Sequence, residues 1–236
     1  MGLTDKIKIY ADGADLETAL RMIEQYNVKG FTTNPTLMHK KGIKDYQKFA
    51  KEFIAVVRDY PISFEVFEDD FEEMRRQARL INSWGDNVYV KIPIMNTEER
   101  STAGLIAELN KEEIKINTTA VFTEDKIDGL ENVFDSGTPG IISIFAGRIA
   151  DAGHDPKEKI KYALNKFRSK PHVEILWAST REPYNIIEAI NCRCHIITVP
   201  NNIIEKIPTF GKDLYAFSLE TVNMFREDAL KSGYAL

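Results

Sequence analysis

Strand-like and helix-like hydrophobic patterns alternate along almost the whole chain. In each unit a short apolar or alternating segment precedes a longer one in which apolar residues recur every three or four positions. In the first unit, Ile7, Ile9 and Ala11 alternate with polar or charged residues, and Leu16 and Leu20 then follow at helical spacing. Eight strands are expected, at residues 7–11, 30–33, 62–66, 88–92, 114–119, 140–143, 173–178 and 195–199.

Eight consecutive strand–helix units favour an α/β fold in which the strands close into a (β/α)₈ or TIM barrel. An open doubly wound sheet is the alternative, but open sheets of this size usually contain fewer units. The chain has 236 residues, and single barrels of about 250 residues are common. We therefore predict one barrel domain spanning residues 1–236.

The chain continues beyond the last expected strand. Residues 209–231 contain more apolar side chains than one buried stripe of a helix requires. We predict a C-terminal helical extension over 209–231 that either covers its own barrel or packs on a neighbouring subunit. A homo-oligomer is therefore expected.

The charge balance argues against nucleic-acid or membrane partners. Lysine and arginine number 31 against 36 aspartate and glutamate, a net charge of −5, so no basic field would attract polyanions. Cys192 and Cys194 are predicted to be buried free thiols, which is typical of proteins in a reducing compartment. Neither a signal peptide nor a membrane-spanning run is evident, so a cytoplasmic location is expected. The scattered histidines argue against a metal site, and no cofactor is expected.

Polar residues lie at the carboxyl ends of the expected strands, where barrels of this type place their functional groups. Parity supports an inward direction for them: Lys91 alternates with Val90 and Ile92, which can cover the helix layer. The candidates, in chain order, are Asp12, Asn34, Glu65, Lys91, Asn117, Thr119, Ser143, Ser179 and Arg181.

Lys91 is unusual because burying an ammonium without partners is costly. Two interpretations are open. Either Asp12 or Glu65 forms a permanent ion pair with it, or burial favours the neutral amine, which can attack a carbonyl. The surrounding carboxylates, amides and hydroxyls favour the second, because a polyhydroxylated carbonyl substrate needs such groups and an ion pair does not.

Five segments on the second, fourth, fifth, sixth and seventh expected strands resemble the successive signatures of the transaldolase family, in the family's order. The resemblance extends over nearly the whole chain. The length of the chain is similar to that of the short bacterial branch, which also contains the fructose-6-phosphate aldolases. The segments are Gly30-Phe31-Thr32-Thr33-Asn34-Pro35-Thr36-Leu37, Val90-Lys91-Ile92-Pro93, Ile116-Asn117-Thr118-Thr119, Ile142-Ser143-Ile144-Phe145-Ala146-Gly147-Arg148 and Ala178-Ser179-Thr180-Arg181.

The resemblance implies a role for each candidate. Lys91 would form a Schiff base with a ketose, and Asp12 would move the proton during cleavage of the carbon–carbon bond. Glu65 would act with Thr119 through a water to form and hydrolyse the imine. The hydroxyls of the dihydroxyacetone fragment would be held by Asn34, Asn117 and Ser143. The terminal anion of the sugar would be held by Arg148, Ser179 and Arg181.

Two residues bear on the choice between transfer and simple cleavage. At two positions this chain has Glu65 and Phe145. It resembles the transaldolases there, whereas the fructose-6-phosphate aldolases have glutamine and tyrosine at these positions. We therefore predict transfer of a dihydroxyacetone unit from a ketose such as fructose 6-phosphate, an intermediate of pentose phosphate metabolism, to an aldehyde. The chain departs from the family at Gly13, Ile144 and Trp177, which leaves a sulfosugar such as 6-deoxy-6-sulfofructose open as the substrate.

Other interpretations also stay open at this point. A fructose-6-phosphate aldolase would release dihydroxyacetone to water, and a non-catalytic barrel would bind a sugar phosphate without turnover. A metal-dependent aldolase would need a cluster of histidines or carboxylates. For Arg148 alone, the simpler alternative to anion binding is a surface ion pair with Asp151.

Overall fold

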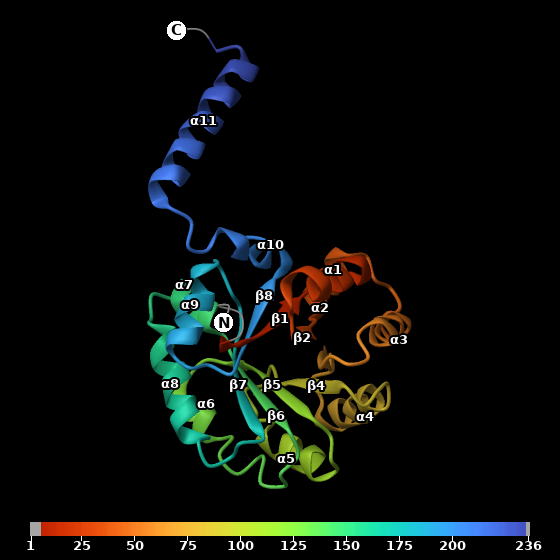
Figure 1. Ribbon diagram of the computed structural model, residues 1–236. Helices are drawn as coiled ribbons and strands as arrows, with labels where there is room; N and C mark the ends of the chain where they lie inside the picture. Colours follow the sequence, from red (N-terminus) through yellow and green to blue (C-terminus); the bar gives the residue numbers. More distant parts are fainter. Residues whose placement is uncertain (1–5, 235–236) are drawn as a thin grey trace. The chain divides into compact units, whose positions relative to one another are not determined.

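The computed structural model describes residues 6–234, which form two compact units, one ending at Ile204 and the other starting at Glu205. Eight parallel strands make the first unit a closed barrel in which each strand pairs with its sequence neighbours and β8 returns to β1. Figure 1 shows the strands at the centre of this unit with the helices outside. The strands are β1 (Lys8–Asp12), β2 (Gly30–Thr32), β3 (Ile62–Glu65), β4 (Val88–Pro93), β5 (Ile116–Val121), β6 (Gly140–Ile144), β7 (Val173–Trp177) and β8 (Ile196–Pro200).

The predicted (β/α)₈ barrel is therefore confirmed, with small differences at the strand ends. The largest concerns β5, which begins at Ile116 and continues to Val121, two residues later than predicted at each end. The pairing of β5 with β6 shifts register between Thr118 and Val121, and Ala120 there has a φ of 57°. Such a bulge adds a residue that an alternation pattern does not show.

Ten α-helices lie in the described part of the first unit, residues 6–204. Aspartate side chains cap α1, α3, α4 and α8 by accepting hydrogen bonds from backbone N–H groups of the first turn, and at α8 the capping residue Asp155 is followed by Pro156. Thr123 precedes α6, but its side chain makes no capping hydrogen bond. The helices are α1 (Leu16–Tyr26), α2 (Pro35–Lys40), α3 (Tyr46–Val56), α4 (Phe71–Asn82), α5 (Ala103–Lys111), α6 (Glu124–Asp128), α7 (Ala146–Asp151), α8 (Pro156–Lys166), α9 (Tyr184–Asn191) and α10 (Asn201–Ile204).

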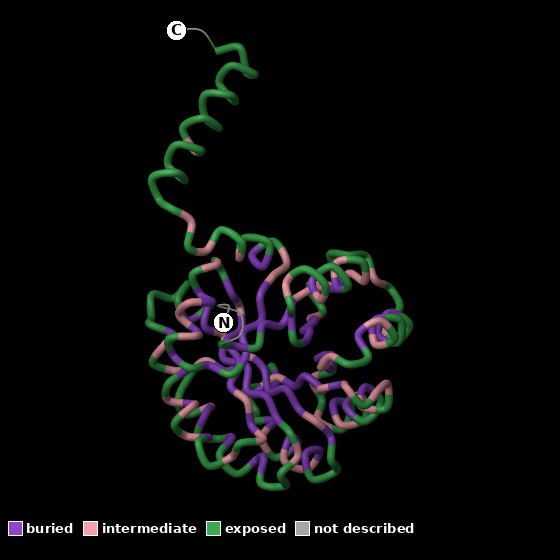
Figure 2. Tube along the Cα trace, viewed as in Figure 1, coloured by how far each residue is buried: buried purple, intermediate pink, exposed green. Residues whose placement is uncertain are grey.

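The barrel is buried on both faces of its sheet. Val88, Val90 and Ile92 are almost completely buried, as expected for side chains that alternate with Lys91 on β4. Figure 2 shows the buried strands in purple and the exposed outer sides of the helices in green. The register also pairs Lys91 with Glu65 on one side and with Asn117 on the other, so three polar residues lie side by side at one level of the barrel.

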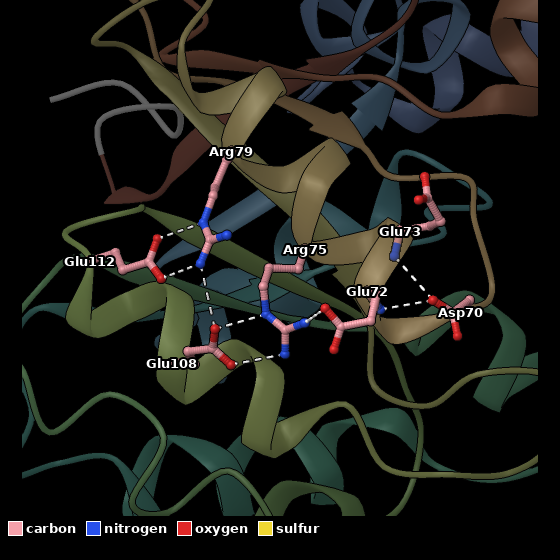
Figure 3. A network of polar contacts seen from close by, with 7 residues as sticks. All are labelled: Asp70, Glu72, Glu73, Arg75, Arg79, Glu108 and Glu112. Atoms are coloured by element: carbon pink, nitrogen blue, oxygen red, sulfur yellow. Dashed lines mark hydrogen bonds and ion pairs between the residues drawn. The ribbon is translucent and has the colours of Figure 1, made fainter.

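Ion pairs join the two helices that flank β4, the strand that carries Lys91. Arg75 binds Glu108 at 2.7 Å and Glu72 at 2.5 Å, while Arg79 binds Glu112 at 2.7 Å (Figure 3). These side chains are largely at the surface, where each such pair contributes about 0.2–1 kcal/mol. The network therefore orients α4 and α5 more than it stabilises the fold.

The second unit contains a short 3₁₀ helix, η2 (Ile207–Thr209), and one long helix, α11 (Leu214–Ser232). α11 starts later than the predicted 209–231 extension because Gly211 has a φ of 77° and the Asp213 side chain caps the helix through the Ala216 N–H. Its end at Ser232 agrees with the prediction within one residue. The assignment of the whole chain to one barrel domain with this extension stays a prediction. Among residues 6–234, no helix is long and apolar enough to cross a membrane.

Candidate active site

A cavity of about 570 Å³ opens at the carboxyl ends of the barrel strands. Its wall contains every candidate residue from the sequence except Asn117, so strand-end position was a sound guide to which side chains converge. The lining residues are Asp12, Thr32, Asn34, Pro35, Thr36, Leu37, Lys40, Glu65, Lys91, Thr119, Ala120, Ser143, Phe145, Arg148, Ala178, Ser179, Thr180, Arg181, Thr198 and Pro200.

Lys91 lies deep in this cavity, with 8% of its surface exposed. Its Nζ atom is 3.0 Å from Glu65 Oε2 and donates a hydrogen bond of 3.3 Å to the Thr33 backbone oxygen. Of the two predicted partners, Glu65 is therefore the one in contact. The ion pair does not fill the space, because both side chains also line the cavity, so a ligand can reach the amine.

Asp12 occupies a different environment at the same end of the barrel. Its Oδ1 atom accepts a hydrogen bond of 2.9 Å from the hydroxyl of Thr32, which in turn shares a contact of 2.5 Å with the hydroxyl of Thr198. Burial raises the pKa of Asp12 above its ordinary value, against the opposing effects of the Lys91 charge and the Thr32 hydrogen bond. The two carboxyl groups of the site are therefore held in different ways.

Asn117 is not among the residues that line the cavity, although it pairs with Lys91 in the register of β4 and β5. Its side-chain nitrogen donates to Ser63 Oγ at 3.0 Å, and its side-chain oxygen accepts from Ser143 Oγ at 2.7 Å. Its carboxamide is thus engaged inside the barrel, and its partner Ser143 lines the cavity. That Asn117 itself binds a ligand stays a prediction.

Asn34 and Thr119 keep hydrogen-bonding capacity for a ligand. The side-chain oxygen of Asn34 caps α2 by accepting a hydrogen bond of 2.9 Å from the Leu37 N–H, and its side-chain nitrogen donates to no group among residues 6–234. The Thr119 hydroxyl is buried without a hydrogen-bond partner in the same part of the chain. A buried hydroxyl without a partner is costly unless a water or a ligand binds it.

The two arginines come from neighbouring segments after β6 and β7. Gly147 makes this possible: a Cβ atom there would lie 1.6 Å from the Ser179 backbone oxygen, so only glycine lets α7 approach so closely. Arg148 lies over the Phe145 ring, with its guanidinium carbon 5.6 Å from the ring centroid. The surface pair considered for Arg148 and Asp151 is not the one formed, because Asp151 instead binds Arg181 at 2.6 Å.

Two residues of the wall have left-handed backbone conformations that serine and alanine rarely adopt. Ala120 has a φ of 57° and Ser179 a φ of 65°. Each such residue costs about 1–3 kcal/mol and persists only where the surrounding structure fixes it, often at a functional site. Neither conformation has a signal in the sequence, because neither position is a glycine or an asparagine.

The sequence also missed residues that complete the wall. Thr32 contacts both Asp12 and Thr198 through its hydroxyl. The inward direction of both threonines follows from strand parity, which could have identified them. Lys40, in the last turn of α2, lines the cavity on another side. Among residues 6–234, no group of three or more His, Cys, Asp or Glu is arranged to hold a metal ion.

Comparison with solved structures places the barrel among known folds. A putative fructose-1,6-bisphosphate aldolase from Coccidioides immitis matches with a TM-score of 0.55 at 13% identity, covering 89% of this chain and 83% of that one. A tryptophan synthase α-subunit from Pyrococcus furiosus matches with a TM-score of 0.58 at 12% identity, covering 92% and 96%. At these identities the likeness concerns the fold alone.

Sequence relatives are more specific. The profile of the family described as transaldolase/fructose-6-phosphate aldolase matches residues 9–233. A probable transaldolase 2 of Listeria monocytogenes is 34% identical over 92% of this chain and 100% of its own length. A probable transaldolase of Dehalococcoides mccartyi is 31% identical over 84% and 88%. The chain is therefore an enzyme of the transaldolase/fructose-6-phosphate aldolase family.

Proposed function

We propose that the protein is a Schiff-base transaldolase that transfers a dihydroxyacetone unit from a ketose with a terminal anion, such as fructose 6-phosphate, to an aldehyde. The observation that supports this proposal most is the buried Lys91 amine. It contacts Glu65 and lines a cavity whose wall also contains Asp12. The family supplies the reaction class, and the arrangement of these three side chains supports the mechanism.

Imine formation comes first. Glu65 takes a proton from the Lys91 ammonium, to which it is already paired, and the neutral amine adds to the ketone of the substrate. Loss of water then gives the protonated imine. The Thr119 hydroxyl, which is buried and has no partner among the described residues, is suited to hold the water that leaves and later returns.

Carbon–carbon cleavage follows. Asp12 accepts the proton of the hydroxyl on the carbon that becomes the departing aldehyde, and the bonding electrons move into the imine to give an enamine. Burial favours the protonated form of Asp12, so its carboxylate is a more effective base than a fully solvated one. The enamine then adds to the acceptor aldehyde, Asp12 returns its proton to the new hydroxyl, and water releases the product ketose.

The rest of the wall would hold the substrate. Asn34, Asn117 and Ser143 would bind the hydroxyls of the dihydroxyacetone fragment, and the side-chain oxygen of Asn117 accepts a hydrogen bond from Ser143. The terminal anion would lie near Arg148, Arg181 and Ser179. Phe145 offers no hydroxyl that could protonate the enamine, which supports transfer over release of free dihydroxyacetone.

Borohydride trapping tests this proposal. Incubation with fructose 6-phosphate and borohydride should add the mass of the reduced fragment to Lys91, and Lys91→Met should gain none. Lys115→Met, which removes a lysine outside the cavity, is the matched control and should label normally. With an aldehyde acceptor, a new ketose is expected. Free dihydroxyacetone would favour the aldolase alternative, and failure to label Lys91 would leave a barrel that binds without turnover.

A ketose with a terminal sulfonate, such as 6-deoxy-6-sulfofructose, is the second candidate substrate. The observation that favours it is the Arg181–Asp151 pair of 2.6 Å, which takes up part of the positive charge at the anion end of the cavity. The same trapping experiment with the sulfonated ketose separates the two. A higher kcat/KM for one substrate identifies it and indicates whether the enzyme acts in pentose phosphate metabolism or on sulfosugars.

Assembly and location are further parts of the proposal. Apolar residues along α11 are exposed, which supports a homo-oligomer, with a ring assembly as one form. Cys192 and Cys194 are both buried free thiols, which supports the cytoplasm as the location. The partners proposed are small ketoses and aldehydes with a phosphate or similar anion. Nucleic acid and membranes are not among them.

A further inference from the structure

The geometry points to Asp151 as a specificity-determining residue that makes the cavity prefer a singly charged terminal anion over a doubly charged one. Asp151 is a positioning residue, because it acts through Arg181 and does not itself line the cavity. This inference rests on the proposed function in one respect, namely that the substrate's anionic end lies beside Arg148 and Arg181.

Asp151 occupies one edge of the Arg181 guanidinium. Nε of Arg181 lies 3.1 Å from Oδ2 and 3.3 Å from Oδ1 of Asp151, and Nη2 lies 2.6 Å from Oδ2. A guanidinium has two edges that can bind an oxyanion with paired N–H groups. With the Nε edge taken, only the edge formed by Nη1 and the remaining Nη2 hydrogen is left for a ligand.

The position of Asp151 follows from the fold. It ends α7, three residues after Arg148 and so on the same side of the helix. The start of α7 is held against the segment after β7 by the close approach of Gly147 to the Ser179 oxygen. Arg181 is fixed at the backbone as well, because its N–H donates to Asn185 Oδ1 at 2.9 Å. The pair therefore joins two segments whose spacing is already set.

The charge at this end of the cavity is correspondingly low. Arg148 and Arg181 supply two positive charges and Asp151 one negative charge, so these three residues together carry a net charge of +1. The hydrogen bonds from Arg181 hold the pKa of Asp151 below its ordinary value, and the charge of Arg148 acts in the same direction, so Asp151 stays ionised at neutral pH. Lys40 also lines the cavity, on α2.

A terminal sulfonate carries one negative charge and matches this net charge. A phosphate ester carries one negative charge below about pH 6 and two above it. The second charge is repelled by the carboxylate of Asp151, and one edge of Arg181 is already used by that carboxylate. Asp151 thus weakens binding of the doubly charged form more than that of the singly charged form.

Equilibrium binding of methyl phosphate and of methanesulfonate tests the inference without requiring turnover. Asp151→Asn keeps a hydrogen-bond acceptor for Arg181 but removes the charge. Above about pH 7 it should strengthen binding of methyl phosphate relative to methanesulfonate by about fivefold. Near pH 5, where methyl phosphate is singly charged, the two ligands should gain equally. Asp151→Glu, which restores the charge, should return the wild-type preference.

Asp135→Asn is the matched control, because Asp135 pairs with Lys170 outside the cavity, and it should leave both affinities unchanged. An unchanged ratio of the two affinities in Asp151→Asn at high pH would overturn the inference, even if Lys91 forms a Schiff base. Conversely, the shifted ratio without any labelling of Lys91 would support the role of Asp151 and contradict the proposed mechanism. With a competent enzyme, the same shift should be found in KM for the two ketoses, with kcat little changed.

Discussion

At the scale of single residues, the two acids of the site, Glu65 and Asp12, have different environments. This difference distinguishes the site most clearly from a structural ion-pair cluster. Glu65 is paired with Lys91 at 3.0 Å, whereas Asp12 contacts the Thr32 hydroxyl at 2.9 Å. Enzymes commonly assign acid and base roles by giving similar groups different environments. The pair suits Glu65 to exchange protons with the amine, and the less polar setting suits Asp12 to take one from a substrate hydroxyl.

The raised pKa of Asp12 predicts a stability gain on replacement. A carboxyl whose pKa in the folded state is raised contributes stability below its ordinary pKa of 3.8, and this contribution is lost as pH rises through the folded value. At neutral pH the ionised Asp12 therefore destabilises the fold. Asp12→Asn should raise the free energy of unfolding by about 1 kcal/mol at neutral pH and by little near pH 3, while abolishing turnover. Urea denaturation across this pH range measures the difference.

Asp15→Asn is the control with the opposite sign. Hydrogen bonds from Thr18 lower the pKa of Asp15 to about 2, so its contribution to stability is present above pH 3.8 and lost as pH falls toward 2. That variant should lose stability at neutral pH and approach the wild type in acid. If Asp12→Asn also lost stability at neutral pH, the conclusion that the ionised Asp12 destabilises the fold would be wrong.

How far the sequence predicted the site depends on the kind of signal at each residue. Lys91 and Glu65 were found because charged residues inside apolar strands are conspicuous. Asn117 was predicted from its place at the end of a strand, and its hydrogen bonds to Ser63 and Ser143 could not be predicted, because parity gives the direction of a side chain and not its partners. The Arg181–Asp151 pair joins residues 30 positions apart on two different segments, and no local pattern records such a contact.

At the scale of elements, α3 is tied to β3 at the residue that pairs with Lys91. The Tyr46 hydroxyl, at the start of α3, accepts a hydrogen bond from the Glu65 N–H at 2.9 Å and donates one to the Glu65 backbone oxygen at 3.1 Å. The ring packs edge-on against Phe67 with centroids 4.6 Å apart. A single tyrosine thus fixes the backbone of the strand end that presents Glu65.

Removing that hydroxyl should affect the chemical step more than substrate binding. Tyr46→Phe keeps the ring and leaves the Glu65 backbone groups without these partners, which should cost about 1–3 kcal/mol of stability. The looser carboxylate should lower kcat by about tenfold with little change in KM. Steady-state kinetics measure the split. Tyr60→Phe is the control, because the Tyr60 hydroxyl makes no hydrogen bond within residues 6–234, and this variant should change neither value. A stability loss with kcat intact would make Tyr46 a structural residue only.

Elements themselves were predicted more successfully than their ends. All eight strands follow from hydrophobic periodicity, because that pattern records which face is buried. The bulge that displaces the end of β5 depends on Ala120 at a φ of 57°, and the turn after β7 depends on Ser179 at 65°. Neither residue is a glycine or an asparagine, the types that adopt such conformations more readily, so residue type alone could not indicate them.

At the scale of the whole molecule, the barrel and the helix α11 differ in how their apolar residues are used. The first unit has an extensive buried core, whereas α11 has no buried residue. Leu219, Val222 and Phe225 are each more than half exposed. Apolar surface of this extent on a folded protein usually marks an interaction site. The sequence predicted the helix and its surplus of apolar residues. It left open whether these residues pack on the chain's own barrel or on a neighbouring subunit.

Assembly through α11 can be tested with charges on its exposed apolar side chains. The double variant Val222→Lys and Phe225→Lys should lower the mass measured by light scattering toward that of a single chain of 26.9 kDa, because burying two lysines in an apolar contact is costly. Asn223→Lys adds a charge at an exposed polar position of the same helix and should keep the wild-type mass. Circular dichroism should remain unchanged in both, since the barrel core is untouched. Wild-type mass in the double variant would mean that α11 does not hold the subunits together, and the exposed side chains would then need a different partner.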